Sequence, residues 1–321
     1  MQNFCTLFDT AYLHKGLALY DSLKQHIEKF HLYIVACDEQ AYKILKQLNL
    51  EFATTISVGE IEKIDTELFA VKSTRSRVEY LWTMTPCIIH YIFSKYKTEN
   101  CTYIDADIYF FNSPFELKEP IDKTSVTITP HWYTPKYDQS KTTGIYCVQY
   151  VYFRNNIEGN EVLSYWRKSC IEWCYNRSEN GKFGDQKYLD VWPTLFPQVK
   201  VCEHRGFGVA AWNVQQYNII NSTKLFIQLT NKEKYEAVFY HFHYFHLRKN
   251  NQIDIGPYII NNQAYQYFYK PYIDKLIEKC IFLKNKFGLE NEFILPLLPI
   301  KKKLRRIIHP CYRLNIKEYK K

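Results

Sequence analysis

The stretch Cys101–Phe115, CTYIDADIYFFNSPF, decides the fold that this chain can adopt. A short apolar run leads into Asp105-Ala106-Asp107, and a second apolar run and an Asn-Ser-Pro turn follow it. Alternate side chains of an extended chain share a face, so the pattern predicts that Asp105 and Asp107 project together. Two carboxylates this close repel each other unless a proton or a cation lies between them. Such a small set of hard oxygen ligands is typical of Mn²⁺ or Mg²⁺, although aspartates that cap a turn would show the same pattern.

The residues before this stretch predict a parallel sheet. Apolar runs at Phe4–Phe8 and Leu32–Ala36 end at Asp9 and Asp38, and a segment with helical spacing follows each run. Uniformly apolar strands that alternate with helices are typical of a parallel sheet covered on both faces. Open sheets of this kind bind ligands at the carboxyl ends of their strands. We therefore expect a doubly wound, nucleotide-binding type of domain with Asp9, Asp38 and Asp105 at its ligand edge.

Two further segments carry side chains suited to a phosphate or a metal ion. Arg75 and Arg77 precede an apolar helix, and guanidinium groups suit a diphosphate, unless they only form a solvated helix face. His241 and His243 would share one face of a strand, with His246 just beyond. A lone histidine is usually a core residue, whereas three of them near a proposed cation site favour metal ligation.

Charge is concentrated at the C-terminal end. Of 42 Lys and Arg in the 321 residues, nine lie in residues 301–321 with one acid, and the rest of the chain is almost neutral. A basic tail is typical of nucleic-acid or anionic-membrane contact, and its interleaved apolar residues favour a membrane surface. The N-terminus does not resemble a secretory signal, and no run reaches the roughly 20 apolar residues of a membrane span. Ten scattered cysteines fit a reducing compartment, so we expect a cytoplasmic protein that can lie on the inner face of the membrane.

Four blocks, spread over roughly residues 4–250, resemble the metal-dependent GT-A glycosyltransferases, specifically the bacterial retaining galactosyl- and glucosyltransferases of family 8. FCTLFDTAYLHKGLALYDSL is similar to the first strand and helix of that family, and YIDADIYF to its D-x-D block. FGDQKYLD is similar to its Asp-Gln pair, and HYFHLRK to its His and Lys six residues apart. The implied fold is α/β: a GT-A, Rossmann-like doubly wound mixed sheet over residues 1–265. A helical arm and the basic tail would occupy residues 266–321.

The resemblance implies a role for each matching position. Asp105, Asp107 and His243 would bind Mn²⁺ or Mg²⁺, with the choice between His241 and His243 left open. Asp185 would orient the donor sugar and Gln186 would lie beside its anomeric carbon, although Asp185 could instead cap the next helix. The positions implied to contact the nucleotide sugar are Thr6, Phe8, Asp9, Tyr12, Arg75, Arg77, Asp105 and Lys249.

The sequence departs from the family pattern at three places. His246 stands where the family usually has Gly, and no Pro-Trp follows Lys249. The segment Tyr146-Cys147-Val148-Gln149 replaces a commoner Asn-x-Gly. These departures affect the expected sugar contacts and the choice of histidine ligand.

The implied activity is transfer of a sugar from a nucleotide diphosphate sugar, with UDP-sugars favoured, to a glycan or glycolipid in cell-surface polysaccharide or lipopolysaccharide synthesis. A metal-dependent nucleotidyltransferase could also use a D-x-D motif, but it favours a Gly-rich phosphate loop, which the 10 glycines do not supply. A nucleic-acid-binding protein acting through the tail is a third reading. The nearly neutral body and the lack of a visible RNA or DNA module count against it.

Overall fold

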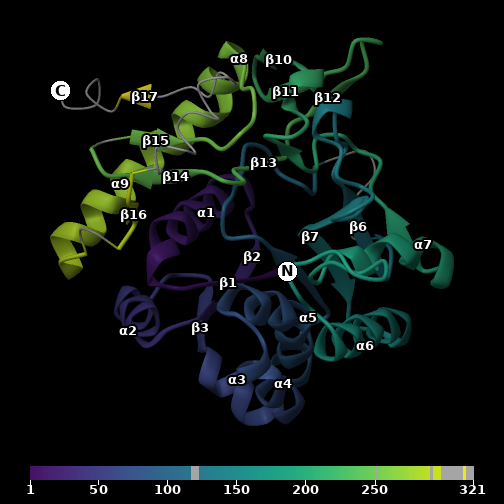
Figure 1. The fold of residues 1–321 in the computed structure, drawn as a ribbon. Coiled ribbons are helices and arrows are strands. Elements are labelled where there is room, and N and C mark those ends of the chain that lie inside the picture. Colours follow the sequence, from purple (N-terminus) through teal and green to yellow (C-terminus); the bar gives the residue numbers. More distant parts are fainter. Residues whose placement is uncertain (117–122, 251, 290–291, 298–313, 316–321) are drawn as a thin grey trace.

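A seven-stranded mixed sheet forms the centre of the structure. The computed structural model describes residues 1–321 except 117–122, 251, 290–291, 298–313 and 316–321 (Figure 1). The strand order is β3-β2-β1-β4-β7-β6-β8. The strands from β3 to β4 are parallel, whereas β7 is antiparallel to both β4 and β6, so the predicted α/β mixed sheet is confirmed. The strands are β1 (Gln2–Phe8), β2 (Phe30–Ala36), β3 (Ala53–Ser57), β4 (Asn100–Ile104), β6 (Val126–Pro130), β7 (Tyr146–Arg154) and β8 (Val199–Val201).

Helices cover both faces of this sheet because apolar residues of β1 and β2 alternate between two cores. The odd-numbered residues Cys5 and Leu7 pack in the core that contains α5 and α6. The even-numbered residues Phe4 and Phe8 pack in the core that contains α1 and α2. The helices are α1 (Leu13–His26), α2 (Glu39–Leu48), α3 (Val58–Ile64), α4 (Thr66–Val71), α5 (Arg77–Tyr96), α6 (Ile157–Glu172), α7 (Trp192–Leu195), α8 (Asn262–Ala264) and α9 (Lys270–Phe287).

A small sheet, ordered β5-β13-β9, connects the D-x-D segment to the histidines. Its strands are β5 (Ile108–Phe110), β13 (Phe239–His241) and β9 (Val209–Ala210), and Ile108 pairs with His241. Two other small sheets lie outside the central one. They contain β10 (Asn218–Asn221), β11 (Leu225–Gln228) and β12 (Lys234–Glu236), and β14 (His246–Arg248), β15 (Gln252–Asp254), β16 (Ile294–Leu295) and β17 (Leu314–Asn315).

The predicted C-terminal helical arm is present as α9, which lies against α1 (Figure 1). Tyr272 of α9 shares a buried core with Ala18 of α1, and the ammonium groups of Lys275 and Lys279 lie 3.3 and 2.5 Å from Asp21. The domain boundary at residue 265 stays a prediction. The basic tail, residues 301–321, lies outside the described residues apart from β17. Among the described helices, none combines the length and the apolar character needed to cross a membrane.

Candidate active site

The candidate site lies where the strand order of the sheet reverses direction. Successive strands β1, β2 and β3 extend to one side of β1, and β4 pairs with its other side. Such a switch point leaves a crevice at the carboxyl ends of the strands, where open α/β sheets bind ligands. Asp9 directly follows β1 and Asp105 directly follows β4. Both aspartates therefore lie at the edge that the sequence predicted for ligand binding.

Asp105, Asp107 and His241 form a group that fits a divalent cation. One ligand atom of each residue lies within 4.8 Å of the others. The Nε2 atom of His241 is 3.2 Å from an Asp107 carboxylate oxygen and 3.8 Å from one of Asp105. Two carboxylates and one imidazole are ligands that Mn²⁺ accepts, and Mg²⁺ accepts the carboxylates. The side chains present at this position therefore fit the predicted ion.

Gln149, at the end of the segment that departs from the family pattern, orients His241. Its Oε1 lies 2.8 Å from Nδ1 of His241. When Nδ1–H donates to Gln149, the lone pair of Nε2 faces the two carboxylates, as in many metal sites. Gly208 leaves the room that this amide needs, since a Cβ there would come within 2.5 Å of the Gln149 side chain. The sequence pattern identifies Gln149 only as a departure from the family 8 pattern and gives no indication of this positioning role.

His243, the ligand favoured from the sequence, lies outside this three-residue group. The expectation that His241 and His243 share one strand face is wrong, because β13 ends at His241. Beyond β13 the Phe245 amide donates to the carbonyl of Phe242 at 3.0 Å, and Tyr244 turns the chain with a φ of 61°. The choice of His243 as a ligand stays a prediction, and His241 is the better placed histidine.

The His243 ring is partly buried and contacts the hydroxyl group of Tyr258. Its Nδ1 lies 3.2 Å from the Tyr258 hydroxyl. Burial and the nearby His241 lower the pKa of His243 to about 3, so its imidazole is neutral at physiological pH. The ring centroid is 5.7 Å from that of His241, which makes His243 a neighbour of the group.

The two aspartates of the D-x-D motif differ in their electrostatics. Burial raises the pKa of Asp105 to about 6; His241 partly offsets this, and the negative charge of Asp107 adds to it. Burial would also raise the pKa of Asp107, but His241 and the ammonium of Lys15 hold it well below its usual range. Asp107 is therefore the ionised anchor of the group. Lys15, whose Nζ lies 3.7 Å from Asp107, had not been singled out from the sequence.

Asp185 is a buried carboxylate beside the same group. Only 6% of the residue is exposed, and burial together with the charge of Asp105 raises its pKa to about 7. It does not cap the following helical turn, because Gln186 holds the N-cap position of Lys187–Val191 and makes no side-chain cap bond there. The Gln186 amide donates to the carbonyl of Thr143 at 2.9 Å. A buried, electrostatically costly carboxylate beside a candidate metal group is typical of a functional residue.

The residues predicted to contact the nucleotide lie around the end of β1. Thr6 and Phe8 are buried in β1, and Gly16 of α1 allows the approach of Phe8, since a Cβ there would lie 2.3 Å from its ring. Asp9 accepts a hydrogen bond from Arg77 at 2.8 Å. Tyr12 is half-buried, and burial and the negative charge of Asp107 raise its pKa. The structure thus brings Asp9, Arg77 and Tyr12 together at the carboxyl end of β1.

Arg75 and Lys249 make contacts with other parts of the chain. Arg75 donates to the hydroxyl of Tyr175, over whose ring its guanidinium lies, and to the carbonyl of Ile171 in α6 at 3.0 Å. Lys249 is exposed just beyond β14, and its backbone amide donates to the carbonyl of Leu295 at 2.9 Å. The predicted contacts of Arg75 and Lys249 with a diphosphate therefore stay predictions.

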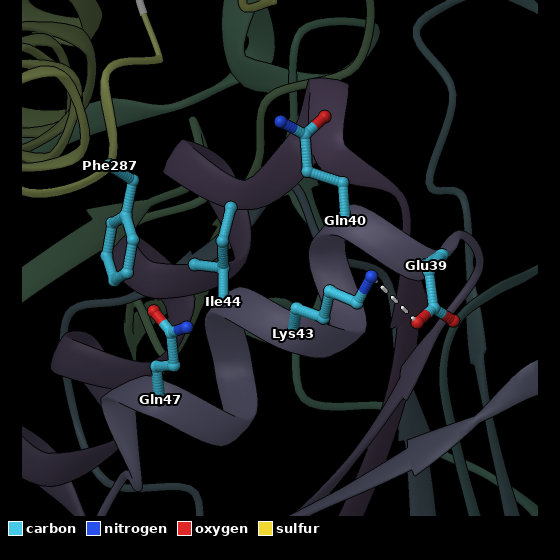
Figure 2. A pocket seen from close by; sticks show the side chains of 6 residues that line it. All are labelled: Glu39, Gln40, Lys43, Ile44, Gln47 and Phe287. Atoms are coloured by element: carbon cyan, nitrogen blue, oxygen red, sulfur yellow. Dashed lines mark ion pairs between the residues drawn. The ribbon is translucent and has the colours of Figure 1, made fainter.

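A separate cavity of about 470 Å³ lies on the outer side of α2 (Figure 2). Phe287, at the end of α9, closes one side of it, and Ile44 supplies the other apolar surface. Its rim carries the Lys43–Glu39 ion pair of 3.3 Å. None of the residues predicted to bind a metal or a nucleotide sugar lines this cavity, and an open surface of this kind has no convergent catalytic groups.

Comparison with known proteins identifies the family to which the chain belongs. It is 30% identical over 278 residues to YfnD of Bacillus subtilis (strain 168), across 84% of this chain and 87% of that protein. The chain belongs to the YfnD family. YfnF of the same organism is 28% identical over 258 residues, across 78% of this chain and 84% of YfnF, and both relatives are named as uncharacterized proteins. No family model matches the chain.

The fold of this YfnD-family member is that of a solved sugar transferase. The galactosyltransferase LgtC, in complex with donor and acceptor sugar analogs, superimposes with a TM-score of 0.51 at 10% identity. The match covers 95% of this chain and 100% of LgtC. The GT-A fold predicted from the sequence is thereby confirmed, and the likeness to family 8 remains suggestive.

Proposed function

We propose that this protein is a metal-dependent glycosyltransferase that moves a sugar from a nucleotide diphosphate sugar to a glycan or glycolipid acceptor. The observation that carries the proposal is the position of the Asp105–Asp107–His241 group at the switch point of a GT-A sheet, with Asp185 buried beside it. We favour a UDP-sugar donor and a cell-surface polysaccharide or lipopolysaccharide acceptor on the family 8 resemblance alone. A peripheral position on the membrane is proposed from the basic residues of the C-terminal tail.

In this proposal Asp105, Asp107 and His241 hold Mn²⁺ or Mg²⁺, which when bound acts as a Lewis acid for the departing diphosphate. Gln149 keeps Nε2 of His241 turned towards the ion through its 2.8 Å contact with Nδ1. Asp185 accepts hydrogen bonds from the donor sugar and holds it in one orientation, which lowers the entropic part of the barrier. Gln186 lies next to Asp185 and would face the anomeric carbon.

The nucleotide would lie along the end of β1. The Asp9–Arg77 pair at 2.8 Å is at its rim, where 60% of the Arg77 side chain is exposed. An exposed guanidinium can exchange its carboxylate partner for a phosphate at little cost, because surface ion pairs contribute only about 0–1 kcal/mol. The half-buried ring of Tyr12 offers an aromatic surface at the same edge. We propose that the nucleotide contacts five residues here: Thr6, Phe8, Asp9, Tyr12 and Arg77.

Nucleotide release from a panel of UDP- and GDP-sugars tests the reaction class. We expect slow hydrolysis of one donor in Mn²⁺, faster release when an acceptor glycan is added, and loss of release in EDTA. Metal-dependent release of pyrophosphate from a nucleoside triphosphate would instead identify a nucleotidyltransferase. Absence of turnover and of nucleotide binding for every donor would reject the proposed function.

A pair of histidine variants tests which imidazole binds the ion. His241→Ala should weaken Mn²⁺ binding by at least tenfold, whereas His243→Ala should change it less than threefold, since only His241 lies in the three-residue group. Mn²⁺ binding is measured directly, by the loss of the electron paramagnetic resonance signal of the free ion. The reverse order of the two effects would return the ligand role to His243, as the family resemblance implied.

A further inference from the structure

Lys15 is a buried cation directly beside the proposed metal group. Only 2% of its side chain is exposed, and its Nζ lies 3.7 Å from Asp107, which is beyond hydrogen-bond length. Within the described part of the chain this ammonium has no hydrogen-bond partner. A buried ammonium is costly unless it is paired and hydrogen-bonded. An acceptor from a ligand would therefore stabilise the Lys15 ammonium, because the described residues supply none.

The position of Lys15 is set by packing on α1. Its Nζ lies 4.2 Å from the centroid of the Tyr12 ring. The next residue, Gly16, lies against Phe8 and has no room for a side chain. Since the lysine is fully enclosed in the first turn of α1, its ammonium cannot withdraw to solvent when another cation arrives.

A divalent ion leaves the charges around Lys15 unbalanced. The groups that face it are the carboxylate of Asp107 and the imidazoles of His14, His241, His243 and His246. With His241 neutral, as a metal ligand must be, Asp105, Asp107, Lys15 and a divalent ion together carry one net positive charge. A diphosphate, with two negative charges, reverses that excess and offers acceptor oxygens to the ammonium.

We propose that Lys15 couples the binding of the divalent cation to the binding of the donor diphosphate. It opposes the ion alone by charge repulsion, and it donates to the diphosphate once the ion and the nucleotide are present together. The inference rests on the proposed function and adds a residue and a binding order to it. Lys15 would thus keep the site from holding a metal ion without its substrate.

Mn²⁺ and UDP titrations of the full chain test this coupling. The variant is Lys15→Met, which preserves the length and packing of the stem. Lys24→Met is the matched control, because Lys24 lies on the same helix but is exposed and pairs with Glu51 at 3.1 Å. Free Mn²⁺ is followed by electron paramagnetic resonance with and without saturating UDP, and UDP binding is measured by calorimetry with saturating Mn²⁺. A circular dichroism melt accompanies each protein.

The two affinities should move in opposite directions. In Lys15→Met, Mn²⁺ alone should bind at least fivefold tighter, and UDP in the presence of Mn²⁺ should bind at least tenfold weaker. The Lys24→Met protein should match the wild type in both. If Lys15→Met changes neither affinity, or weakens both, the coupling role is wrong although the proposed function stands.

The wild-type protein supplies a measurement that does not depend on any variant. Saturating UDP should tighten Mn²⁺ binding by more than tenfold, whereas uridine, which lacks phosphates, should not tighten it. Equal Mn²⁺ affinity with and without UDP would overturn the inference even if the variant failed to fold. Wild-type protein that binds neither Mn²⁺ nor UDP would remove the proposed function, and the inference with it.

Discussion

In the Asp107→Asn variant, metal-dependent nucleotide release should fall by at least 10²–10³-fold, the loss typical when one preorganised charge is removed from an active site. Asp107 contacts both His241, at 3.2 Å, and Lys15, at 3.7 Å, and these neighbours keep its pKa well below the usual range. The carboxylate is therefore ionised at every physiological pH. Its replacement removes the best defined ligand of the proposed ion, so the rate and the Mn²⁺ affinity should fall together.

The same variant should also be less stable than the wild type, because Lys15 and His241 lose the carboxylate that compensates them. Asp274→Asn is the matched control. Asp274 is a half-exposed aspartate on α9 that pairs with Lys270 at 3.0 Å, and its loss should change neither rate nor stability by a measurable amount. Activity close to the wild-type level in Asp107→Asn would show that the metal assignment is wrong.

The Asp185→Asn variant should be much less active and yet more stable than the wild type at pH 8. Burial and the charge of Asp105 raise the pKa of Asp185 to about 7. Because this value exceeds the ordinary one near 4, the folded state binds the proton more tightly than the unfolded state. The stability that Asp185 contributes is thus complete below about pH 4 and is lost as the pH rises towards 7. Asparagine stays neutral and avoids that loss.

The expected gain in the free energy of unfolding at pH 8 is on the order of 2–4 kcal/mol, since each pKa unit corresponds to about 1.4 kcal/mol. Urea unfolding at pH 8 measures this gain, and it should shrink towards zero as the pH approaches 4. Nucleotide release should fall on the order of 10²-fold, because the sugar loses its orienting carboxylate. An equally active variant would exclude Asp185 from sugar binding. Unchanged stability at pH 8 would show that burial does not raise the pKa of Asp185.

The central sheet and the D-x-D position could be derived from local sequence patterns. Phe4–Phe8 and Leu32–Ala36 are continuous apolar runs with an acidic residue beyond them, and the structure places β1 and β2 there. The sequence also predicted that Asp105 and Asp107 project together, and their carboxylates do lie in one group, but they lie in a turn between β4 and β5 and not in an extended strand. A helical spacing likewise predicted α9.

The ligand assignment at the histidine cluster depends on contacts between distant segments. Alternation along one strand predicted equal exposure of His241 and His243 to the ion, but the strand ends after His241. The amide of Phe242 still donates to the carbonyl of Asp107, more than 130 positions earlier in the chain, and the chain then turns at Tyr244, whose φ is 61°. Gln149, which orients His241, comes from a third segment, so no short-range pattern could have identified it.

The role of Lys15 likewise could not be predicted from the sequence. In sequence it is one lysine near the start of an amphipathic helix, where such residues are usually solvated. Tertiary packing of α1 against β5 and α9 buries it and turns its ammonium towards Asp107. The apolar periodicity of this chain thus determines which segments become strands and helices, because that depends on neighbours a few residues away. Which charged groups meet, and with what pKa, depends on how those segments pack, because burial and Coulomb interactions act through space.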